Sequence, residues 1–494
     1  MKTLVKQLSI IAFISFMSLN SCKKDDPIVT PDPDPVEVLT AKAGPDQTTD
    51  VQQAILLDGS SSASSMNKPF AYSWQFTKKP VGSMATIQNN TTAKPGFTPD
   101  MVGEYDLELT ILNASGQSKD VVIINVTASQ PLELDESIDV ETVLADRVTD
   151  PDLPDYFVNK DIRINAQLTV EPGVMIQFKR DTRMDVNDNG AIIAKGTTEK
   201  KIKFTGIDQT GASWKGIVIY SNNSGNLFEN VEILYSGSTP GLNVKKAALT
   251  LFGISHAYIS LKNCLISQSG GYGLHAAAGS VLGNFESNSF TNNAEAGILL
   301  ESANVPKLDK LSTFTGNGKN VVEILQSNLD NTSHSEEVWA GFNDGTPYRL
   351  SGDLFVKTGW KLEPGVIVEA ENQVTIEVHS TGYLNAVGTT DKHIVFTGAT
   401  KANAFWKGIR SYSTSSGNKI EYGEIRYAGS SDIVSGRKAN LAITGSLSSM
   451  SIKNSIISNG GGYGISVGYG SSINNDAETV NTFEDNLFGN IKKD

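Results

Sequence analysis

A stretch of 47 residues occurs twice in this chain without a gap. Residues 171–217 align with residues 363–409 at a constant offset of 192, and 20 of the 47 positions are identical. The identical positions include the runs Glu-Pro-Gly-Val, Gly-Thr-Thr, Phe-Thr-Gly and Trp-Lys-Gly-Ile. Most of them are glycine, threonine or apolar residues, which a stacked scaffold needs more than a reactive site does. The repeat therefore constrains the fold more strongly than the activity.

Short β-type runs bounded by Gly or Asn continue from about Leu132 to Asp494, without convincing helical periodicity. Within each copy the paired positions stay apolar at spacings of two, as a strand with one buried face requires. Outward neighbours differ, for example Lys203 against Val395 and Lys195 against Val387. The expected inward pairs are Ile176/Val368, Met184/Ile376, Val186/Val378, Ile192/Leu384, Ala194/Ala386, Ile202/Ile394 and Phe204/Phe396.

Runs such as 263–267, 270–274 and 288–293, with counterparts at 454–458, 461–465 and 481–486, resemble the rungs of a right-handed parallel β-helix. Repeats of this kind cannot bury a face alone and must stack on their neighbours. The resemblance implies one continuous stack over 132–494, with copies at about 147–305 and 339–494 joined through 301–342. The expected fold class is all-β, with an internal duplication.

Residues 39–128 show short period-2 runs separated by turn residues, which predict a small antiparallel β-sandwich. The landmark runs are Ala-Gly-Pro-Asp-Gln at 43–47, Leu-Asp-Gly-Ser at 57–60, Tyr-Ser-Trp at 72–74, Phe-Thr-Pro-Asp at 97–100 and Gly-Glu-Tyr at 103–105. Together they closely resemble a PKD domain, an immunoglobulin-like module of extracellular proteins. The resemblance implies a spacer or a binding accessory, with Trp74 as the core tryptophan.

The chain opens with Lys2, Lys6 and an apolar run over 8–17, which is too short to span a bilayer and predicts a secretory signal at 1–21. Leu19-Asn20-Ser21 directly precedes Cys22 and resembles the lipobox of bacterial lipoproteins. The resemblance implies cleavage before Cys22 and its acylation, so that several lipid chains hold the protein to a membrane. The alternative is an ordinary signal peptide followed by an accidental cysteine.

Residues 22–38 hold four prolines and five acidic residues, which favours an extended, solvated tether. Lys23-Lys24-Asp25-Asp26 is similar to the export signal that sends some gram-negative lipoproteins to the outer leaflet. This similarity implies a surface-exposed outer-membrane lipoprotein, and the alternative is a solvated charge run.

The formal net charge of −13 argues against nucleic acid as a partner, because phosphate binding needs basic patches. Cys264 is the only cysteine besides Cys22, so a lipidated Cys22 leaves no intrachain disulfide. Ser455 takes the place of Cys264 in the second copy, which predicts a small packed residue and not a reactive thiol.

No catalytic set emerges from the sequence. Carbohydrate-cleaving β-helices place paired carboxylates, or a Lys or Arg base beside acids, on one outer face, and this chain has no Asp-Asp pair in a strand. Its histidines are scattered without metal-ligand spacing. Residues 185–190 match the first half of a calcium loop, but Gly196 stands where the pattern needs Glu. We therefore expect no metal and no cofactor.

The remaining functional signal is aromatic. Trp214 and Trp406 are each followed by Lys, and Tyr235 and Tyr427 each follow a Glu by three residues. Aromatic faces flanked by polar groups stack well on sugar rings, so these four residues are candidate glycan contacts. The alternative is that they pad the outer wall between coils.

Together these features predict a lipid-anchored cell-surface protein whose PKD-like spacer carries a non-catalytic β-helix. Its expected partner is a polysaccharide or another surface component, bound as by an adhesin or a glycan-capture protein. The alternative is a polysaccharide-degrading enzyme of the lyase type. A flat or aromatic outer face would favour binding, and a groove holding several acids with a Lys or Arg would favour the enzyme.

Overall fold

The computed structural model describes residues 34–148, 150–240, 245–330 and 336–494. The expected signal peptide at 1–21, Cys22 and the motif at 23–26 lie outside the described residues. The described chain divides into two compact units, the first ending at Val126 and the second running from Thr127 to Asp494, with Asp50–Gln52 assigned to the second. No helix among the described residues is long and apolar enough to cross a membrane.

The first unit is a small β-sandwich built mainly from antiparallel pairs. Trp74 is 1% exposed and its indole N–H donates to the carbonyl of Thr92 at 3.1 Å, which confirms it as the core tryptophan. Sheets form in the order β2-β8-β7-β5, with two-stranded pairs β1-β4 and β3-β6. The strands are β1 (Leu39–Thr40), β2 (Gln47–Asp50), β3 (Ile55–Leu56), β4 (Ala63–Ser64), β5 (Ala71–Lys78), β6 (Gly96–Phe97), β7 (Gly103–Asn113) and β8 (Gly116–Thr127).

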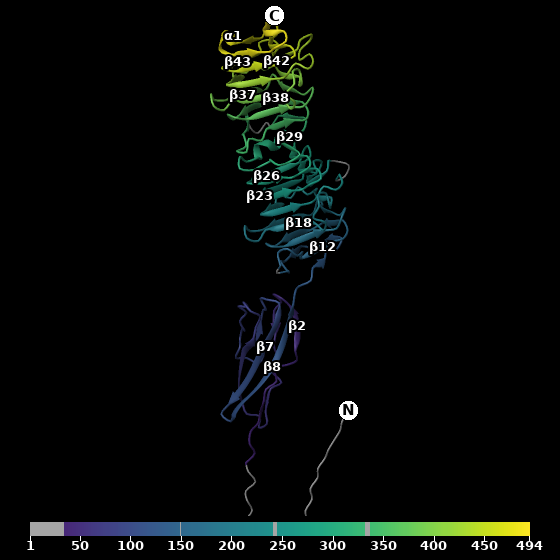
Figure 1. The fold of residues 1–494 in the computed structure, drawn as a ribbon, viewed down its shortest axis with the longest axis vertical. Coiled ribbons are helices and arrows are strands. Elements are labelled where there is room, and N and C mark those ends of the chain that lie inside the picture. Colours follow the sequence, from purple (N-terminus) through teal and green to yellow (C-terminus); the bar gives the residue numbers. More distant parts are fainter. Residues whose placement is uncertain (1–33, 149, 241–244, 331–335) are drawn as a thin grey trace, which may run out of the picture. The chain divides into compact units, whose positions relative to one another are not determined.

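The second unit is a parallel β-helix, in which each strand pairs in parallel with the strand one coil further on (Figure 1). One sheet of 14 strands, called here the long sheet, runs through both copies of the repeat. Its strands are β10 (Ser137–Ile138), β13 (Ile162–Ile164), β16 (Arg183–Val186), β19 (Gly216–Ile219), β22 (Ala247–Leu251), β25 (Tyr272–Ala276), β28 (Ala296–Leu300), β29 (Lys319–Ile324), β32 (Tyr348–Leu350), β35 (Ile367–Ala370), β38 (Ile394–Gly398), β41 (Gly423–Arg426), β44 (Ile456–Ser458) and β47 (Thr482–Glu484).

Two further sheets complete the first copy. The first seven-stranded sheet holds β9 (Leu132–Glu133), β12 (Tyr156–Val158), β15 (Met175–Phe178), β18 (Ile202–Gly206), β21 (Val231–Leu234), β24 (Leu265–Ser267) and β27 (Ser289–Thr291). The first six-stranded sheet holds β11 (Thr142–Leu144), β14 (Gln167–Val170), β17 (Ala191–Lys195), β20 (Leu227–Glu229), β23 (Tyr258–Lys262) and β26 (Val281–Glu286).

Two other sheets complete the second copy. The second seven-stranded sheet holds β30 (Ser327–Leu329), β33 (Leu354–Val356), β36 (Thr375–Val378), β39 (Gly408–Ser411), β42 (Ala439–Ile443), β45 (Tyr463–Val467) and β48 (Gly489–Lys493). The second six-stranded sheet holds β31 (Glu336–Trp339), β34 (Gly359–Leu362), β37 (Tyr383–Val387), β40 (Lys419–Glu421), β43 (Ser449–Lys453) and β46 (Ser472–Ile473). Short helical turns occur at η2 (Ser302–Lys307) and α1 (Ala477–Val480).

The inward face expected from the paired positions is confirmed. All fourteen residues of those pairs are at most 1% exposed and belong to one hydrophobic cluster. The strand register stacks them on one another, as where Phe204 pairs with Ile176 on one side and Ile233 on the other. Lys203, one position along, is only half-buried. Burial of one apolar column per strand is what holds each coil to the next.

Equivalent strands of the two copies lie in different sheets. β16 belongs to the long sheet, whereas its counterpart β36 belongs to the second seven-stranded sheet. The long sheet continues through the joint between the copies, where η2 packs beside β26 in place of a strand and β29 stacks directly on β28. The second copy is therefore turned by one face around the stack, so a feature that the repeat duplicates is not displayed twice on the same face.

Candidate functional site

The two repeated tryptophans lie in the core, so the sugar-stacking role expected for them is wrong. Trp214 and Trp406 are both 0% exposed. Their indole N–H groups donate to the carbonyls of Leu234 at 2.8 Å and Arg426 at 2.7 Å. The ring of Trp214 also stacks on Phe178 with centroids 4.0 Å apart. These rings pack inside the stack, and neither meets a ligand nor pads the outer wall.

Tyr235 and Tyr427 are half-buried, and their backbones take left-handed φ values of 58° and 64°. The carbonyl of Tyr235 accepts the N–H of Ser213 at 2.7 Å, and that of Tyr427 accepts the N–H of Phe405 at 2.8 Å. Both tyrosines thus close the turns that place the buried tryptophans, which explains why the repeat keeps them. A contact of either ring with a glycan stays a prediction.

The half-matched calcium loop is a polar turn of the stack. Asp185 is 7% exposed and pairs with Arg183 at 2.7 Å, so its carboxylate is already neutralised. Over the described ranges, no group of three or more His, Cys, Asp or Glu side chains could hold a metal ion. Cys264 is 2% exposed and Ser455 1% exposed, which confirms a small packed position, and burial raises the pKa of the Cys264 thiol to about 12.

Two adjoining clefts open on the first copy, where the chain turns from the first seven-stranded sheet into the long sheet. The amide cleft has a volume of about 720 Å³ and is formed by the loops that precede β19, β25, β28 and β29. Its polar side chains include Gln268, Asn292, Asn293 and Asn317, and small residues such as Gly270 form much of the rest. Successive coils thus contribute successive parts of one groove.

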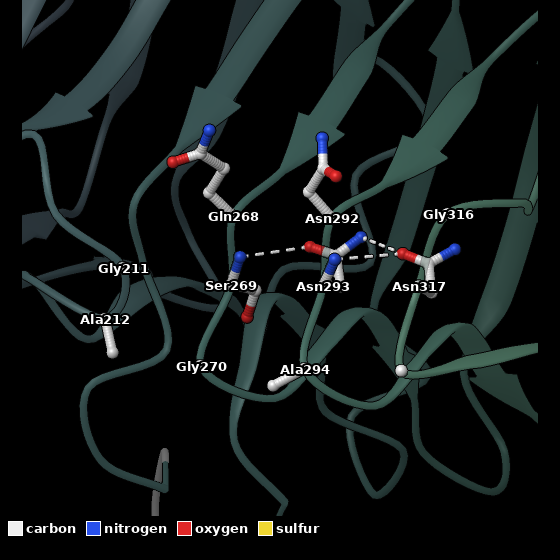
Figure 2. A pocket seen from close by; sticks show the side chains of 11 residues that line it. Gly211, Ala212, Gln268, Ser269, Gly270, Asn292, Asn293, Ala294, Gly316 and Asn317 are labelled. Atoms are coloured by element: carbon white, nitrogen blue, oxygen red, sulfur yellow. Dashed lines mark hydrogen bonds between the residues drawn. The ribbon is translucent and has the colours of Figure 1, made fainter.

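Figure 2 shows that two of these amides belong to a ladder that holds the coils together. The side-chain oxygen of Asn317, Oδ1, accepts hydrogen bonds from the backbone N–H of Asn293 at 3.0 Å and from the side-chain amide of Asn293 at 2.9 Å. The amide nitrogens of Asn293 and Asn317 also donate to backbone carbonyls one coil earlier, at 3.1 and 2.8 Å. Their hydrogen-bonding capacity is used inside the stack.

The other two amides of the cleft have no such role. Gln268 and Asn292 have left-handed backbones, with φ of 59° and 57°, and their side chains point away from the ladder in Figure 2. Neither side chain is hydrogen-bonded to another described residue. An amide offers both a donor and an acceptor, which suits the hydroxyl groups of a sugar.

The second cleft, called here the lysine cleft, shares Gly270 with the amide cleft and has a volume of about 400 Å³. The side chains that matter at this cleft are charged or phenolic, and they come from four coils of the stack. They are Lys245, Lys246, Tyr272, Glu295, Lys319 and Glu323. The lysine cleft thus continues the same groove, and charged side chains line it where amides line the first cleft.

A pair of glycines positions the lysines. A Cβ atom on Gly271 would lie 2.1 Å from the carbonyl oxygen of Lys246, and one on Gly270 would lie 2.6 Å from the Cβ of Ala212. The backbone N–H of Tyr272 donates to that Lys246 carbonyl at 2.8 Å. Only glycine allows this close approach of two backbones, and the approach brings Lys246 to the rim of the cleft.

The floor of the lysine cleft is a network of opposite charges. Lys319 Nζ lies 2.9 Å from Glu295 and 3.5 Å from Glu323, and the hydroxyl of Tyr272 donates to Glu323 at 3.2 Å. Burial disfavours the ammonium of Lys319, but the two carboxylates outweigh it and raise its pKa. Burial and the charges of Glu323 and Glu295 raise the pKa of Tyr272. Both groups therefore stay protonated at neutral pH.

His275 lies three residues beyond Tyr272 on β25 but lines neither cleft. It is 6% exposed, and burial together with the charge of Lys245 lowers its pKa to about 4. The imidazole is therefore neutral at physiological pH and shut off from the groove.

The second copy repeats the backbone that forms the lysine cleft but, among its described residues, has no counterparts of Glu295 and Glu323 beside its tyrosine. Arg437 and Lys438 stand in place of the two lysines, and Gly461-Gly462-Tyr463 in place of Gly270-Gly271-Tyr272. A Cβ atom on Gly462 would lie 2.0 Å from the carbonyl oxygen of Lys438, much as in the first copy. Tyr463, however, packs against the ring of Phe488 and not against carboxylates.

Sequence reasoning recognised the Gly-Gly-Tyr run as a rung but missed the groove beside it. The available signal was the basic pair that recurs at the repeat offset, Lys245-Lys246 and Arg437-Lys438. The other charged residues that line the cleft, Glu295, Lys319 and Glu323, lie up to 78 positions further along the chain and carry no motif.

Known proteins resemble the first unit. The family model described as K319L-like, PKD domain matches residues 43–126. The solution structure of the PKD domain from KIAA 1837 protein is 31% identical over 17% of this chain and 83% of that one, with a TM-score of 0.15. That of the PKD domain from human KIAA0319 is 18% identical over 20% of this chain and 88% of that one, with a TM-score of 0.17.

One further structure matches a smaller share of its own length. It is a nucleoside hydrolase-related hypothetical protein from Saccharophagus degradans, associated with carbohydrate metabolism, at 17% identity and a TM-score of 0.17. The match covers 18% of this chain and 25% of that chain. No curated protein matches the sequence.

These observations define an all-β protein with a small sandwich followed by a parallel β-helix. Residues 43–126 form a PKD domain, since they match the model described as K319L-like, PKD domain.

Proposed function

We propose that the protein is a surface-exposed outer-membrane lipoprotein that captures carbohydrate with its β-helix. Cys22 would carry the lipid, and the PKD domain would serve as a spacer. The observation that carries the binding function is the groove of the first copy, where the amide cleft and the lysine cleft adjoin at Gly270. Its open, polar lining with unpaired amides at Gln268 and Asn292 suits a hydroxyl-rich chain.

The groove runs along the stack, because its lining residues come from successive coils. Gly270, Ala294 and Gly318 precede neighbouring strands β25, β28 and β29 of the long sheet. Adjacent strands of a sheet lie about 4.8 Å apart, so three coils present about 10 Å of groove. Consecutive sugar rings of one chain can therefore contact consecutive coils.

Binding is tested with a glycan array probed with the purified protein, followed by affinity measurements on the best ligand. Gln268→Ala is expected to weaken binding by several-fold, since a ligand hydrogen bond contributes about 1 kcal/mol. Asn459→Ala is the matched control, because Asn459 occupies the equivalent position of the second copy and has a similar φ of 54°. Failure of every glycan to bind would refute the capture function.

A polysaccharide lyase is the second candidate, because the lysine cleft does hold two acids beside a lysine. Elimination from an acidic sugar needs a base that takes a proton beside the carboxyl group. Lys319 and Tyr272 both have raised pKa values and so hold their protons at neutral pH. His275 is neutral but buried outside the cleft. This protonation favours binding over catalysis, and an ultraviolet assay for unsaturated sugar ends on acidic polysaccharides tests the lyase directly.

A further inference from the structure

We infer that the lysine cleft binds an anionic group, a carboxylate or a sulfate, carried by the saccharide that the groove captures. This inference rests on the proposed function and names the ligand class of the same site. The ammonium groups of Lys245 and Lys246 supply the charge, while the neighbouring amide cleft contacts the uncharged part of the chain.

The three lysines that line the cleft differ in whether a carboxylate neutralises them. Lys319 forms ion pairs with Glu295 and Glu323, so its charge is already neutralised inside the protein. Lys245 and Lys246 are exposed, and neither forms an ion pair with any residue that the structure describes. Three ammonium groups therefore face two carboxylates at the lining, so the cleft carries a net positive charge within a chain of net charge −13. A local excess of positive charge attracts an anion.

The second copy holds a carboxylate at the place that corresponds to the lysine cleft. Arg437, the counterpart of Lys245, donates to the side-chain carboxylate of Asp494 and lies 3.4 Å from the hydroxyl of Ser466. Ser466 occupies the position that His275 has in the first copy, and the charge of Lys245 acts on His275. The two basic side chains therefore reach the same region of their copies. In the second copy a carboxylate of the protein itself occupies that region.

In the first copy, no described residue places a carboxylate on Lys245 as Asp494 does on Arg437. Asp494 follows β48, which stacks on β45 as β28 stacks on β25, so its counterpart in the first copy is Glu301. The carboxylate of Glu301 instead accepts the backbone N–H of Gly279 at 2.9 Å. The anion position beside Lys245 is thereby left to an external ligand.

The test compares oligogalacturonate with its methyl ester, which has the same rings without the charge, using the purified full-length protein. Dextran sulfate and dextran form the sulfate arm. We expect at least one charged probe to bind about tenfold or more tightly than its neutral counterpart, and its affinity to fall as salt is raised. The Lys245→Ala/Lys246→Ala double variant should lose that preference, because both residues are exposed and their removal leaves the stack intact.

The matched control is the Arg437→Ala/Lys438→Ala double variant, which removes the equivalent pair from the second copy. It should bind like the unaltered protein, since Asp494 already occupies that corner. Equal affinity for charged and neutral probes would overturn the anionic class while leaving carbohydrate capture standing. Undiminished binding by the Lys245→Ala/Lys246→Ala variant would overturn the site. Binding of no saccharide at all would overturn both this inference and the proposed function.

Discussion

Phe204 and Phe396 occupy the same position of the repeated sequence, yet they lie in different sheets of the stack. Phe204 pairs with Ile176 and Ile233 in the first seven-stranded sheet, whereas Phe396 pairs with Val368 and Ile425 in the long sheet. Both side chains are 0% exposed. The repeat therefore preserves which side of a strand is buried, although the copies are turned by one face.

Because the two phenylalanines are equivalent, we expect replacing either one with alanine to destabilise the protein by a similar amount. Phe204→Ala and Phe396→Ala should each lower the free energy of unfolding by about 3–5 kcal/mol, because each leaves a cavity in the core. Lys203→Ala, on the outward side of the same strand as Phe204, should change it by less than about 0.5 kcal/mol. Denaturant titration measures all three. A loss for Lys203→Ala as large as that for Phe204→Ala would contradict the strand orientation.

Anchoring depends on a single residue, Cys22, which is both the expected cleavage boundary and the expected acylation site. Cys22→Ser should release the protein from the membrane fraction or leave the signal peptide uncleaved, because the acyl chains can no longer be attached. Fractionation with immunoblotting reads both outcomes. Unchanged membrane retention with normal processing would rule out the lipoprotein assignment.

Surface exposure is a separate prediction that concerns the residues after Cys22. Replacing Lys24, Asp25 and Asp26 with alanine should leave the protein membrane-bound but lower its protease accessibility on intact cells. The comparison uses the same amount of membrane-bound protein with and without the motif. Unaltered accessibility would mean that the motif is only a solvated part of the tether.

His275 should make the β-helix sensitive to acid. Its pKa is lowered from 6.5 to about 4 in the folded chain, so the unfolded chain binds the proton more tightly. Burial of the neutral imidazole therefore contributes fully to the stability of the fold above about pH 6.5. This contribution is lost as the pH falls toward 4. The strand neighbours Thr250 and Leu299 are uncharged, and Lys245 is the charged group that acts on the ring.

Thermal denaturation of the β-helix across this pH range tests the prediction. His275→Gln should flatten the fall of the melting temperature between about pH 6.5 and 4, because glutamine does not titrate there. His256→Gln is the control for the substitution itself, since it makes the same change at an exposed histidine. An equal slope in His275→Gln and the unaltered protein would show that the imidazole does not contribute.

Prediction of the candidate site from the sequence was less successful than prediction of the fold, and Trp214 shows why. A tryptophan followed by lysine after a turn is compatible with either an exposed or a buried ring. Phe178 and the carbonyl of Leu234 close around it, and each is contributed by a different coil. Burial of a turn residue depends on how neighbouring coils stack, which no local pattern records.

The sequence alone determined the strand phase, the duplication and the two β-type units, because alternation of apolar residues and turn chemistry act over a few positions. Only the tertiary structure decided which face each copy presents, since that depends on which sheet each strand after the joint extends. The lysine cleft is likewise tertiary in origin. Lys245, Glu295 and Glu323 meet because coils of unequal length bring them to one corner, and sequence spacing does not encode that meeting.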